Sequence, residues 1–409
     1  MIPDAAISVA EARARILSAF APLPAETVAL PDALGRVLAE PLTARLTQPP
    51  FAASAMDGWA VRAADIAAVP ATLRRIGEAS AGHEFAGTVG PGEAVRIFTG
   101  APLPAGADAV VMQEDADATA DSVTIRHAVE TGRFVRVAGH DFSAGEELLP
   151  SGRRLTARDI ALAACANRPW LRVRRRPRIA VLATGDEIAL PGEPLGSSQI
   201  VSSNALGLCA LVTSQGGIAH NLGIAGDRAG SLAEVAAGAA GCDLLVTTGG
   251  ASKGDYDLVG EVLGDGGAGL SFRAVAMRPG KAVMFGRAGE VPLLGLPGNP
   301  VSTGVCAVLF LLPLLRRLQG LPPEEDTSRT ARAGVALRAN GPNQDHLRAT
   351  LSFDADGVPV ATPFPRQDTA LMSLLAKADC LIVRPPYAPA AEPGDPVEII
   401  PLSGGCHNL

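Results

Sequence analysis

The sequence predicts a multidomain α/β plus β protein: an α/β domain on a parallel sheet, an inserted β-rich domain and a C-terminal β-barrel. Three observations predict this fold class. Apolar runs alternate with helical patterns over residues 177–320. Short β-branched runs between Gly and Pro turns fill residues 49–141, and a β pattern returns over residues 326–403. A chain of 409 residues is also too long for one ordinary core.

The first part of the chain predicts helices. Ser8 and Glu11 form a capping-box pattern, and apolar residues then recur at helical spacing to Phe20. A second short helix is expected around residues 32–38, and another over residues 156–166. Residues 1–48 plus 142–176 are therefore expected to form an elongated helical domain. The β-rich domain of residues 49–141 interrupts it, with strands expected at Ala94–Phe98, Ala109–Met112, Ser122–Ile125 and Phe134–Val137.

Residues 177–320 predict a parallel sheet covered by helices on both faces, because strands and helices alternate there. Strands are expected at Arg178–Ala183, Ile218–Ile224, Asp243–Thr248, Ser271–Ala276, Ala282–Phe285 and Val291–Leu294. Helices are expected at Asn204–Ser214, Gly230–Ala240, Asp255–Leu263 and Val301–Leu318. In the C-terminal barrel, Asp356-Gly357 predicts a hairpin.

Composition excludes several classes of function. The chain is 47% hydrophobic and 19% charged with a net charge of −7, which predicts a globular protein without the broad basic surface that binds nucleic acid. No signal peptide is apparent, and the most apolar stretch is short for a membrane span, so no membrane contact is expected. The six cysteines form no CxxC pair, which argues against a zinc site and indicates reduced, mostly buried thiols in the cytoplasm.

Three glycine-rich turns each follow an apolar run: Thr184-Gly185-Asp186-Glu187, the segment 247–252, and the segment 295–300. Such turns lie at the carboxyl ends of parallel strands, where ligands bind. Their glycines allow backbone N–H groups to approach an anion. Asp227 follows another strand and Asp257 follows the second turn, and several converging carboxylates favour Mg²⁺. The pattern predicts a site for a phosphorylated small molecule and a metal.

Other motifs leave alternatives open. Arg278 and Lys281 could hold an oxyanion, or could belong to an ordinary solvated turn. The segment 250–254 fits the GxSxG pattern of serine hydrolases around Ser252. The downstream histidines, His346 and His407, both lie outside the α/β segment, which argues against a hydrolase.

Several motifs in order resemble the molybdopterin molybdenumtransferase family, which includes the C-terminal region of gephyrin. These motifs are the three turns above, with Leu296-Pro297-Gly298-Asn299-Pro300, together with Ser54-Ala55-Met56-Asp57-Gly58-Trp59-Ala60-Val61 and Thr99-Gly100-Ala101-Pro102. The resemblance covers nearly the whole chain and implies a molybdopterin-binding fold for the α/β domain.

The resemblance also implies an activity: insertion of molybdenum from molybdate into adenylylated molybdopterin, with Mg²⁺ and release of AMP. It implies a homodimer in which the β-rich domain of one subunit completes the site on the other's α/β domain. Contacts with the adenylyltransferase and with acceptor molybdoenzymes are possible partners. The alternatives are a molybdopterin adenylyltransferase-like enzyme and a non-catalytic cofactor carrier or scaffold.

Matching positions give the implied site residues in four groups. The implied catalytic residues are Asp57, Thr99, Asp141 and Glu187. The implied pterin-binding residues are Thr184, Gly185, Asp186, Gly249, Gly250, Ser252, Pro297, Gly298, Asn299 and Pro300. The implied molybdate residues are Arg278, in place of the family's usual Lys, with Lys281, Arg348 and Ser373. The implied metal ligands are Asp227 and Asp257.

Overall fold

The computed structural model describes residues 6–249, 259, 262, 269–322 and 328–402. Contacts divide the chain into two compact units. The first unit comprises Met1–Glu26, Gly35–Ala39 and Val173–Leu409, and the second comprises Thr27–Leu34 and Glu40–Arg172. Strands β1 (Ala25–Ala29) and β12 (Trp170–Arg174) each include a boundary between the units.

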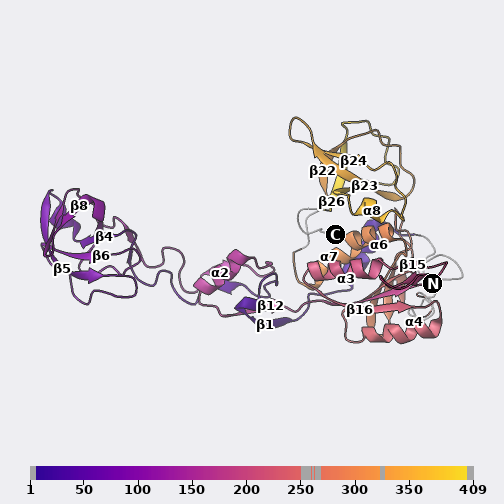
Figure 1. The fold of residues 1–409 in the computed structure, drawn as a ribbon, viewed down its shortest axis with the longest axis horizontal. Coiled ribbons are helices and arrows are strands. Elements are labelled where there is room, and N and C mark those ends of the chain that lie inside the picture. The colour runs from indigo at the N-terminus through magenta and orange to yellow at the C-terminus, as the bar shows by residue number, and fades with distance from the viewer. Residues whose placement is uncertain (1–5, 250–258, 260–261, 263–268, 323–327, 403–409) are drawn as a thin grey trace. The chain divides into compact units, whose positions relative to one another are not determined.

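The second unit is built on a six-stranded sheet, which confirms the expected β-rich region (Figure 1). Its strand order is β7-β4-β6-β5-β9-β8. The strands are β4 (Gly58–Val61), β5 (Ala71–Ala79), β6 (Glu93–Ile97), β7 (Ala109–Met112), β8 (Ala116–Ala118) and β9 (Ser122–Ile125). Strands β4, β6 and β7 pair antiparallel, whereas β5 and β6 pair parallel. Short 3₁₀ turns lie at Ala63–Ile66 and Gln113–Asp115.

The rest of the second unit consists of short pieces. The pairs are β2 (Leu42–Thr43) with β11 (Glu147–Leu149), and β3 (Ala53–Ser54) with β10 (Val135–Arg136). Helix α2 (Ala157–Cys165) begins at a capping box of Thr156 and Asp159. The prediction of a helix at residues 32–38 is wrong. Only a 3₁₀ turn forms at Leu30–Asp32, and Gly35, which follows it, has a left-handed backbone conformation that does not continue a helix.

Helix α1 (Val9–Ser18) belongs to the first unit. The Ser8 hydroxyl caps it by accepting the Glu11 N–H at 3.1 Å. Its buried face, with Val9, Ala12 and Ile16, packs into the core around the α/β sheet. The expected helical domain therefore does not include α1, because an amphipathic helix is placed by the core that covers its apolar face.

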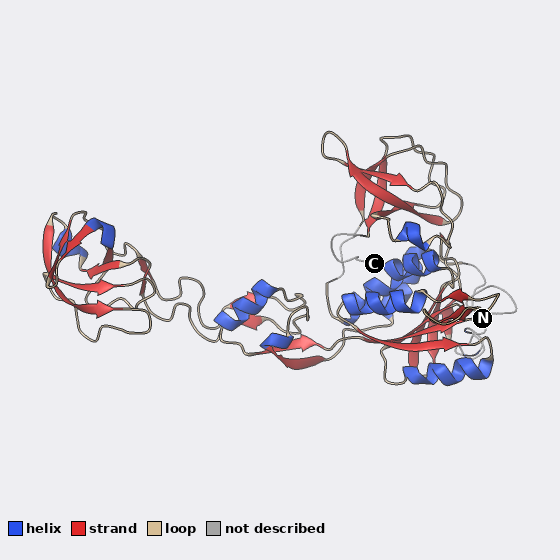
Figure 2. Ribbon diagram, in the orientation of Figure 1, coloured by secondary structure: helices blue, strands red, loops and turns tan. Residues whose placement is uncertain are grey.

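The first unit contains a six-stranded sheet in the order β16-β13-β17-β21-β20-β18. Its strands are β13 (Arg178–Thr184), β16 (Ile218–Ala225), β17 (Leu244–Thr248), β18 (Leu270–Phe272), β20 (Met284–Ala288) and β21 (Val291–Leu296). Helices cover both faces, as expected: α3 (Asn204–Ser214) with α6 (Pro300–Cys306) and α7 (Leu312–Leu318) on one side, and α4 (Ala229–Ala236) on the other (Figures 1 and 2). A 3₁₀ turn, Ala237–Ala239, extends α4. The expected helix Asp255–Leu263 lies almost entirely outside the described residues.

The predicted parallel sheet forms over four strands, and one edge of it is antiparallel. Strands β16, β13, β17 and β21 are parallel, but β20 pairs antiparallel with both β21 and β18. Only Gly289 and Glu290 separate β20 from β21. A two-residue connection can form a hairpin, but it is too short for the crossover that parallel strands require.

A long apolar helix runs through the core of the first unit, as the sequence predicts. It comprises α6 (Pro300–Cys306), a π-helical segment at Ala307–Leu311 and α7 (Leu312–Leu318). Pro313 has no N–H to donate to the preceding turn, which explains the π-helical segment. Pro300–Leu318 is apolar enough to cross a membrane, with mean hydropathy 1.7, but 78% of it is buried inside the protein. It is therefore a core helix.

The C-terminal residues form a closed five-stranded barrel, as predicted. Its strands are β22 (Arg329–Ala333), β23 (Gln344–Phe353), β24 (Pro359–Pro363), β25 (Cys380–Arg384) and β26 (Pro396–Pro401). The ring β23-β24-β22-β26 closes where β25 pairs with both β26 and β23. The hairpin at Asp356-Gly357 is confirmed, with Gly357 in the left-handed region. Short elements complete this unit: β14 (Ile188–Ala189), β15 (Ile200–Val201), β19 (Met277–Arg278) and α8 (Met372–Leu375).

The cysteines differ in part from expectation. The five described cysteines form no disulfide bond with one another. Cys306 and Cys380 are buried, but Cys165 is exposed, and Cys209 and Cys242 are partly buried.

Candidate functional site

The first predicted turn follows β13, the strand at the middle of the parallel part of the sheet. Gly185 has φ +139°, and the Thr184 side chain before it is buried. The Thr184 hydroxyl oxygen has no hydrogen-bond partner among the described residues. A buried hydroxyl without a partner is costly, so a ligand that binds it gains a ready-made polar contact.

The second and third turns approach the first one at close range. Gly249 has φ +97°, and a Cβ atom added to it would lie 2.4 Å from the Thr184 carbonyl oxygen. A Cβ atom on Gly298 would lie 3.5 Å from the Cα atom of Gly249. The three predicted turns therefore converge at the carboxyl ends of β13, β17 and β21, and only glycine fits between Thr184 and the second turn.

Asn204, the first residue of α3, links two of these turns. Its Nδ2 donates to the Thr248 hydroxyl at 2.9 Å and to the Gly298 carbonyl at 2.7 Å. The Thr248 hydroxyl in turn donates to the Pro297 carbonyl at 3.0 Å, and the Thr303 hydroxyl donates to the same oxygen at 2.6 Å. The hydrogen bonds thus fix the position of the Pro297–Gly298 turn relative to β17.

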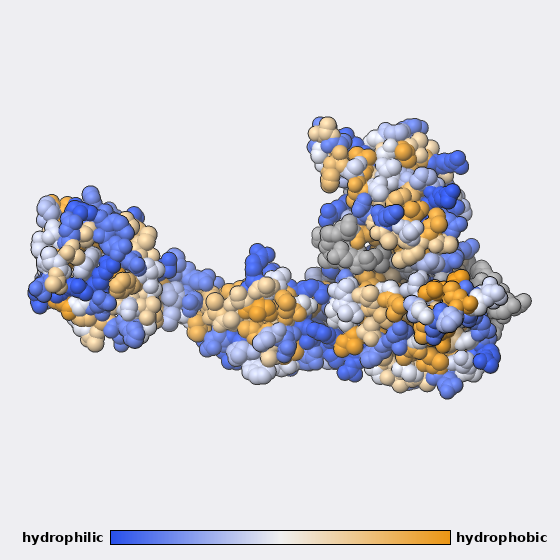
Figure 3. Space-filling view, viewed as in Figure 1, coloured by the Kyte–Doolittle hydropathy of each residue, from blue (hydrophilic) through white to orange (hydrophobic). Residues whose placement is uncertain are grey.

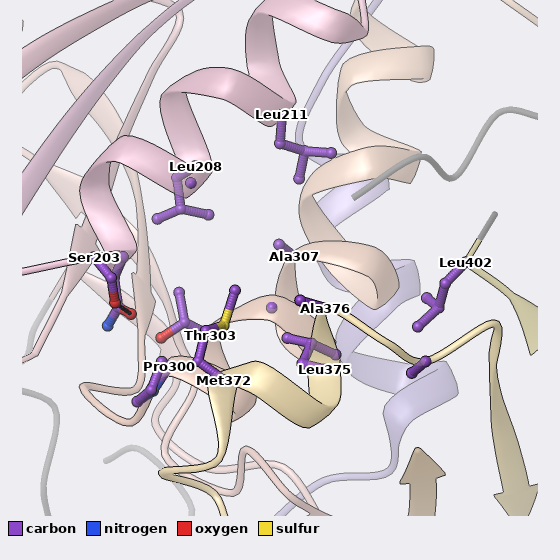
Figure 4. A pocket seen from close by; sticks show the side chains of 14 residues that line it. Ser203, Leu208, Leu211, Pro300, Thr303, Ala307, Met372, Leu375, Ala376 and Leu402 are labelled. Atoms are coloured by element: carbon purple, nitrogen blue, oxygen red, sulfur yellow. Dashed lines mark hydrogen bonds between the residues drawn. The ribbon is translucent and has the colours of Figure 1, made fainter. Parts of the chain in front are cut away.

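Two cavities meet at this point. A small pocket of about 100 Å³ is lined by Thr184, Glu187, Asn204, Thr248 and Gly298, among others. A larger, mostly apolar cleft of about 340 Å³ lies between α3, α6 and α8. Figure 4 shows its side chains pointing inward from these three helices. Both cavities share Ser203, Asn204 and Pro300, so the convergent turns lie at a junction of a polar and an apolar space.

The start of α6 differs from expectation. The N-terminus of a helix usually offers free N–H groups that suit phosphate. Pro300 has no N–H, and the Val301 N–H donates to the Thr369 carbonyl at 3.1 Å. The Thr303 N–H donates to the Asn299 carbonyl at 2.9 Å. Because the C-terminal segment already binds the Val301 N–H, the helix start holds this segment in place.

Two predicted carboxylates meet beside the first turn. The Asp186 N–H donates to Asp227 Oδ2 at 3.3 Å, and the Asp227 N–H donates to Asp186 Oδ1 at 3.1 Å. Glu187 is exposed and lines the small pocket. No group of three or more metal-binding side chains occurs among the described residues. Gly250, Ser252 and Asp257 lie outside them.

Of the predicted molybdate residues, Arg348 lies on barrel strand β23 and Arg278 on β19, which pairs with β23. Ser373 lies in α8, and Lys281 lies in the connection after β19. The sequence places Arg278 on the rim of the α/β sheet, but β19 instead runs parallel to β23, with Arg278 opposite Asp345. Arg278 is 71% exposed and forms an ion pair with the buried Asp345. Because β19 pairs with β23, Arg278 lies on the strand next to the one that carries Arg348. Lys281 and Ser373 are both exposed.

Arg348 is the most unusual side chain of the first unit. It is only 1% exposed, yet neither Nη1 nor Nη2 has a hydrogen-bond partner among the described residues. Its Nε donates to Gln367 Oε1 at 3.3 Å. Burial lowers the pKa of the Arg348 guanidinium, and the charge of Asp368 partly opposes this shift. A cation buried in this way needs an anionic partner.

Asp57 and Thr99 form a compact pair in the second unit. The Asp57 Oδ1 accepts the Thr99 N–H and the Thr99 hydroxyl, both at 2.7 Å. These two hydrogen bonds, together with the charge of Arg96, lower the pKa of the Asp57 carboxyl despite some desolvation. Asp141 is exposed, and its N–H donates to the Gln48 carbonyl at 3.0 Å.

His346 is poorly suited to the serine-hydrolase alternative. It is 1% exposed in the barrel strand β23, and burial lowers its pKa to about 4. Its Nε2 lies 3.2 Å from the Gln344 amide nitrogen. Ser252 and His407 lie outside the described residues, so the hydrolase remains untested.

Sequence reasoning missed four residues of this region: Asn204, Thr248, Asp345 and Gln367. Asn204 carries a usable signal, because it is a polar residue at the start of a helix that follows a candidate ligand-binding turn. Asp345 and Gln367 carry none, because their partners are 67 and 19 residues away in the sequence.

Because the turns converge, we expect Gly249→Ala to lower the free energy of unfolding more than the same substitution at a left-handed glycine with open space around it. Gly241→Ala is the matched control, because Gly241 has φ +80° with open space around its Cα. The control should lose about 1–2 kcal/mol of unfolding free energy from backbone strain alone. Gly249→Ala should lose more, because its Cβ would overlap the Thr184 carbonyl. Equal losses in urea unfolding would contradict the close approach.

Comparisons with known proteins agree with this geometry. A family model described as the MoeA N-terminal region (domain I and II) matches residues 7–166. A probable molybdopterin binding domain matches residues 180–317, and the MoeA C-terminal region (domain IV) matches residues 330–402.

Similar proteins cover most of the chain. The molybdopterin molybdenumtransferase of Nostoc sp. is 41% identical over 342 residues, which cover 81% of this chain and 78% of that protein. The molybdopterin molybdenumtransferase of Haemophilus influenzae is 31% identical and covers 97% of this chain and 99% of its own length. A solved molybdopterin biosynthesis MoeA protein from Pyrococcus horikoshii has a TM-score of 0.85 and 30% identity, covering 98% of this chain and 100% of that one.

The three matched regions follow one another in the same order as the β-rich unit, the α/β sheet and the barrel. With relatives of this identity and coverage, the chain belongs to the MoeA family of molybdopterin molybdenumtransferases.

Proposed function

We propose that this protein inserts molybdenum into molybdopterin, with adenylylated molybdopterin and molybdate as substrates and AMP as a product. The observation that carries the proposal is the buried guanidinium of Arg348, whose two terminal nitrogens have no partner among the described residues. Burying an unpaired ion costs several kcal/mol. An oxyanion such as molybdate would accept both N–H groups in the bidentate geometry that arginine favours.

The surroundings of Arg348 support this assignment. Gln367 holds the guanidinium from one side through Nε and accepts the Arg348 backbone N–H at 3.0 Å. A neutral amide fixes the orientation of the cation without cancelling its charge. Arg278 reaches the neighbouring strand but is already paired with Asp345, so it contributes less net charge.

The pterin substrate is assigned to the three turns of the α/β sheet. The Thr184 hydroxyl is buried and unpartnered, and the small pocket beside it is lined by Glu187, Ser202 and Asn204. Hydroxyl, carboxylate and amide groups are the donors and acceptors that a polar heterocycle needs. The glycine positions allow the substrate to approach the backbone closely.

Mg²⁺ is proposed at Asp227 and Asp257, and the carboxylate of Asp186 lies next to Asp227. Asp186 and Asp227 supply adjacent carboxylates with hard oxygen donors, which suit Mg²⁺. When bound, the ion would neutralise charge on the substrate's phosphate groups.

The reaction needs no covalent enzyme intermediate. Water cleaves the phosphoanhydride bond and AMP leaves. Molybdate exchanges one oxygen for the two dithiolene sulfurs, and that oxygen leaves as water with the two thiol protons. The protein's contribution is positioning and fixed charge: Arg348 orients the oxyanion, and the turns orient the pterin.

A homodimer is proposed from the family resemblance, with Asp57 and Thr99 of one subunit serving the α/β site of the other. Co-expression of an Asp57 variant with an Arg348 variant tests this. Recovery of activity in mixed dimers of the two variants supports a shared site. Mixed dimers that remain as inactive as each variant alone contradict it.

The overall function is tested with purified protein, adenylylated molybdopterin, molybdate and Mg²⁺. Molybdate-dependent AMP release together with formation of molybdenum cofactor supports the proposal. Transfer of adenylyl groups from ATP instead would indicate the adenylyltransferase-like alternative. Tight pterin binding without turnover would indicate a carrier or scaffold.

Arg348→Lys should raise the KM for molybdate about tenfold or more, which corresponds to about 1.4 kcal/mol. Lysine keeps the charge but loses the bidentate geometry. High molybdate should restore turnover, and pterin affinity should change little. Arg332→Lys in the same barrel, 45% exposed on its surface, is the control. An equal loss of pterin affinity would show that Arg348 acts through structure.

Asp57→Ala should lower insertion activity by at least about 100-fold, the range found for a lost charge-stabilising group. The melting temperature should change little, since the Asp57 side chain lies at the surface. Asp121→Ala, at an exposed turn of the same unit, is the control. The pKa of Asp57 is lowered, so its ionised form persists as pH falls below the usual range, and wild-type activity should not titrate through Asp57 at neutral pH. Full activity of Asp57→Ala would remove this residue from the mechanism.

Asp227→Asn should weaken Mg²⁺ binding, measured by calorimetry without substrates. Loss of an outer-shell partner alone costs about 10–100-fold in metal affinity, so loss of a direct ligand should cost no less. Asp356→Asn, in the exposed barrel hairpin, is the control. A wild-type Mg²⁺ titration for Asp227→Asn would disprove the metal assignment.

A further inference from the structure

A second polar hollow lies on the β-rich unit. Its volume is about 310 Å³, and its lining comprises Trp59, Arg75, Glu78, Arg96 and Gln113. The small side chains of Ala116 and Ala118 on β8 also line it. Hydrophilic residues cover much of the visible face of this unit (Figure 3).

The strand register builds the hollow. Arg96 on β6 lies directly opposite Trp59 on β4 and directly opposite Glu78 on β5. Residues opposite one another in a sheet share a face, so these three side chains form a row across three neighbouring strands. A rigid sheet therefore holds the aromatic ring, the cation and the carboxylate at fixed spacing.

Two guanidinium groups share one indole ring. The Arg96 carbon Cζ lies 5.5 Å from the centre of the Trp59 ring, and that of Arg75 lies 5.8 Å away. Arg96 also lies 4.9 Å from the Phe98 ring. Each contact is favourable alone, but two cations on one ring repel each other. Glu78 pairs with Arg75 at 3.2 Å and compensates one charge, which leaves the lining with a net positive charge.

Donor groups remain in the hollow. Arg96 uses Nη1 for the Gly58 carbonyl at 3.1 Å and Nη2 for Gln113 Oε1 at 2.6 Å. Arg75 uses Nη2 for Glu78. Each guanidinium carries five N–H groups, so further donors are present on both. Flat cations with spare N–H groups are typical partners of oxyanions.

We propose that this hollow binds the oxyanion group of a small molecule, a phosphate or an ion of similar shape, between Arg75 and Arg96. Trp59 supports the two guanidinium groups from below. The hollow adjoins a predicted catalytic turn, because the Gln113 N–H donates to the Asp57 carbonyl at 3.1 Å. An oxyanion bound there lies beside the Asp57 turn, but the site does not depend on the function proposed above.

The chain offers a direct optical test. It contains two tryptophans, Trp59 and Trp170, and Trp170 is 62% exposed. The full-length Trp170→Phe variant therefore leaves Trp59 as the only tryptophan. The fluorescence of Trp59 in this variant is measured in separate titrations with inorganic phosphate, AMP and molybdate. A titration with sodium chloride at equal ionic strength corrects for the screening of charges by salt.

We expect a saturable change in Trp59 emission. A response to phosphate alone identifies a simple oxyanion site, whereas a response to AMP without phosphate identifies a phosphate ester. Arg75→Gln, in the Trp170→Phe background, should weaken the response at least about tenfold, the scale of one lost charge-assisted pair. Arg74→Gln is the matched control, because Arg74 lies next in the same strand, is 70% exposed and pairs with Glu93 outside the hollow.

Two outcomes overturn the proposal. One is the lack of any saturable change with all three probes at millimolar concentration. The other is an equal response in the Arg75→Gln and Arg74→Gln variants, which would show that the arginines only cover the indole. Thermal melting of each variant separates loss of binding from loss of folding.

Discussion

Burial of three parallel strands on both faces is the constraint on which the rest of the first unit depends. The residues of β17 are all buried, and β13 is buried from its second residue onward. Their backbone groups therefore have to be satisfied within the sheet, and their buried side chains are apolar up to the threonines at the strand ends, Thr184, Thr247 and Thr248. The polar turns begin where the strands end, which places the buried residues Thr184, Gly249 and Pro297 at one edge of the sheet. The apolar helix Pro300–Leu318 follows from the same demand, because it covers one face of these strands.

The edge so formed is held by hydrogen bonds. At this edge, for which pterin binding is proposed, Asn204, Thr248 and Thr303 fix the turn at Pro297 and Gly298 through neutral groups. In the barrel, where oxyanion binding is proposed, Arg348 is a buried cation oriented by the neutral amide of Gln367. The barrel connects to the sheet's helices through the Val301–Thr369 hydrogen bond, and β19 extends the barrel to Arg278. A change in the barrel can thus reach the start of the core helix without any direct contact with the turns.

The second unit presents charge in another way. Asp57 and Thr99 form an exposed pair, and Arg75 and Arg96 lie over Trp59 on the adjoining sheet face. Here the groups are held by the register of β4, β5 and β6 rather than by burial. The family to which the chain belongs explains the α/β sheet and the barrel as parts of one enzyme. The row of aromatic and charged side chains on the β-rich unit is set by the register of β4, β5 and β6.

The sequence by itself determined the periodic elements: helix Asn204–Ser214, strands β6, β7 and β9 of the β-rich unit, the hairpin at Asp356-Gly357 and the polar turns after buried strands. These depend on local hydrophobic spacing, caps and glycine positions, which can be read from neighbouring residues. Only the tertiary structure decided that α1 joins the α/β core, that β20 runs antiparallel, and that Arg278 leaves the sheet to pair with β23. It also decided the partners of Arg348, Asp345 and Asn204, which lie between 19 and 94 residues away. Local patterns specify which face of an element is apolar, but the surface that covers that face, and the partner of each buried polar group, depend on packing between distant segments.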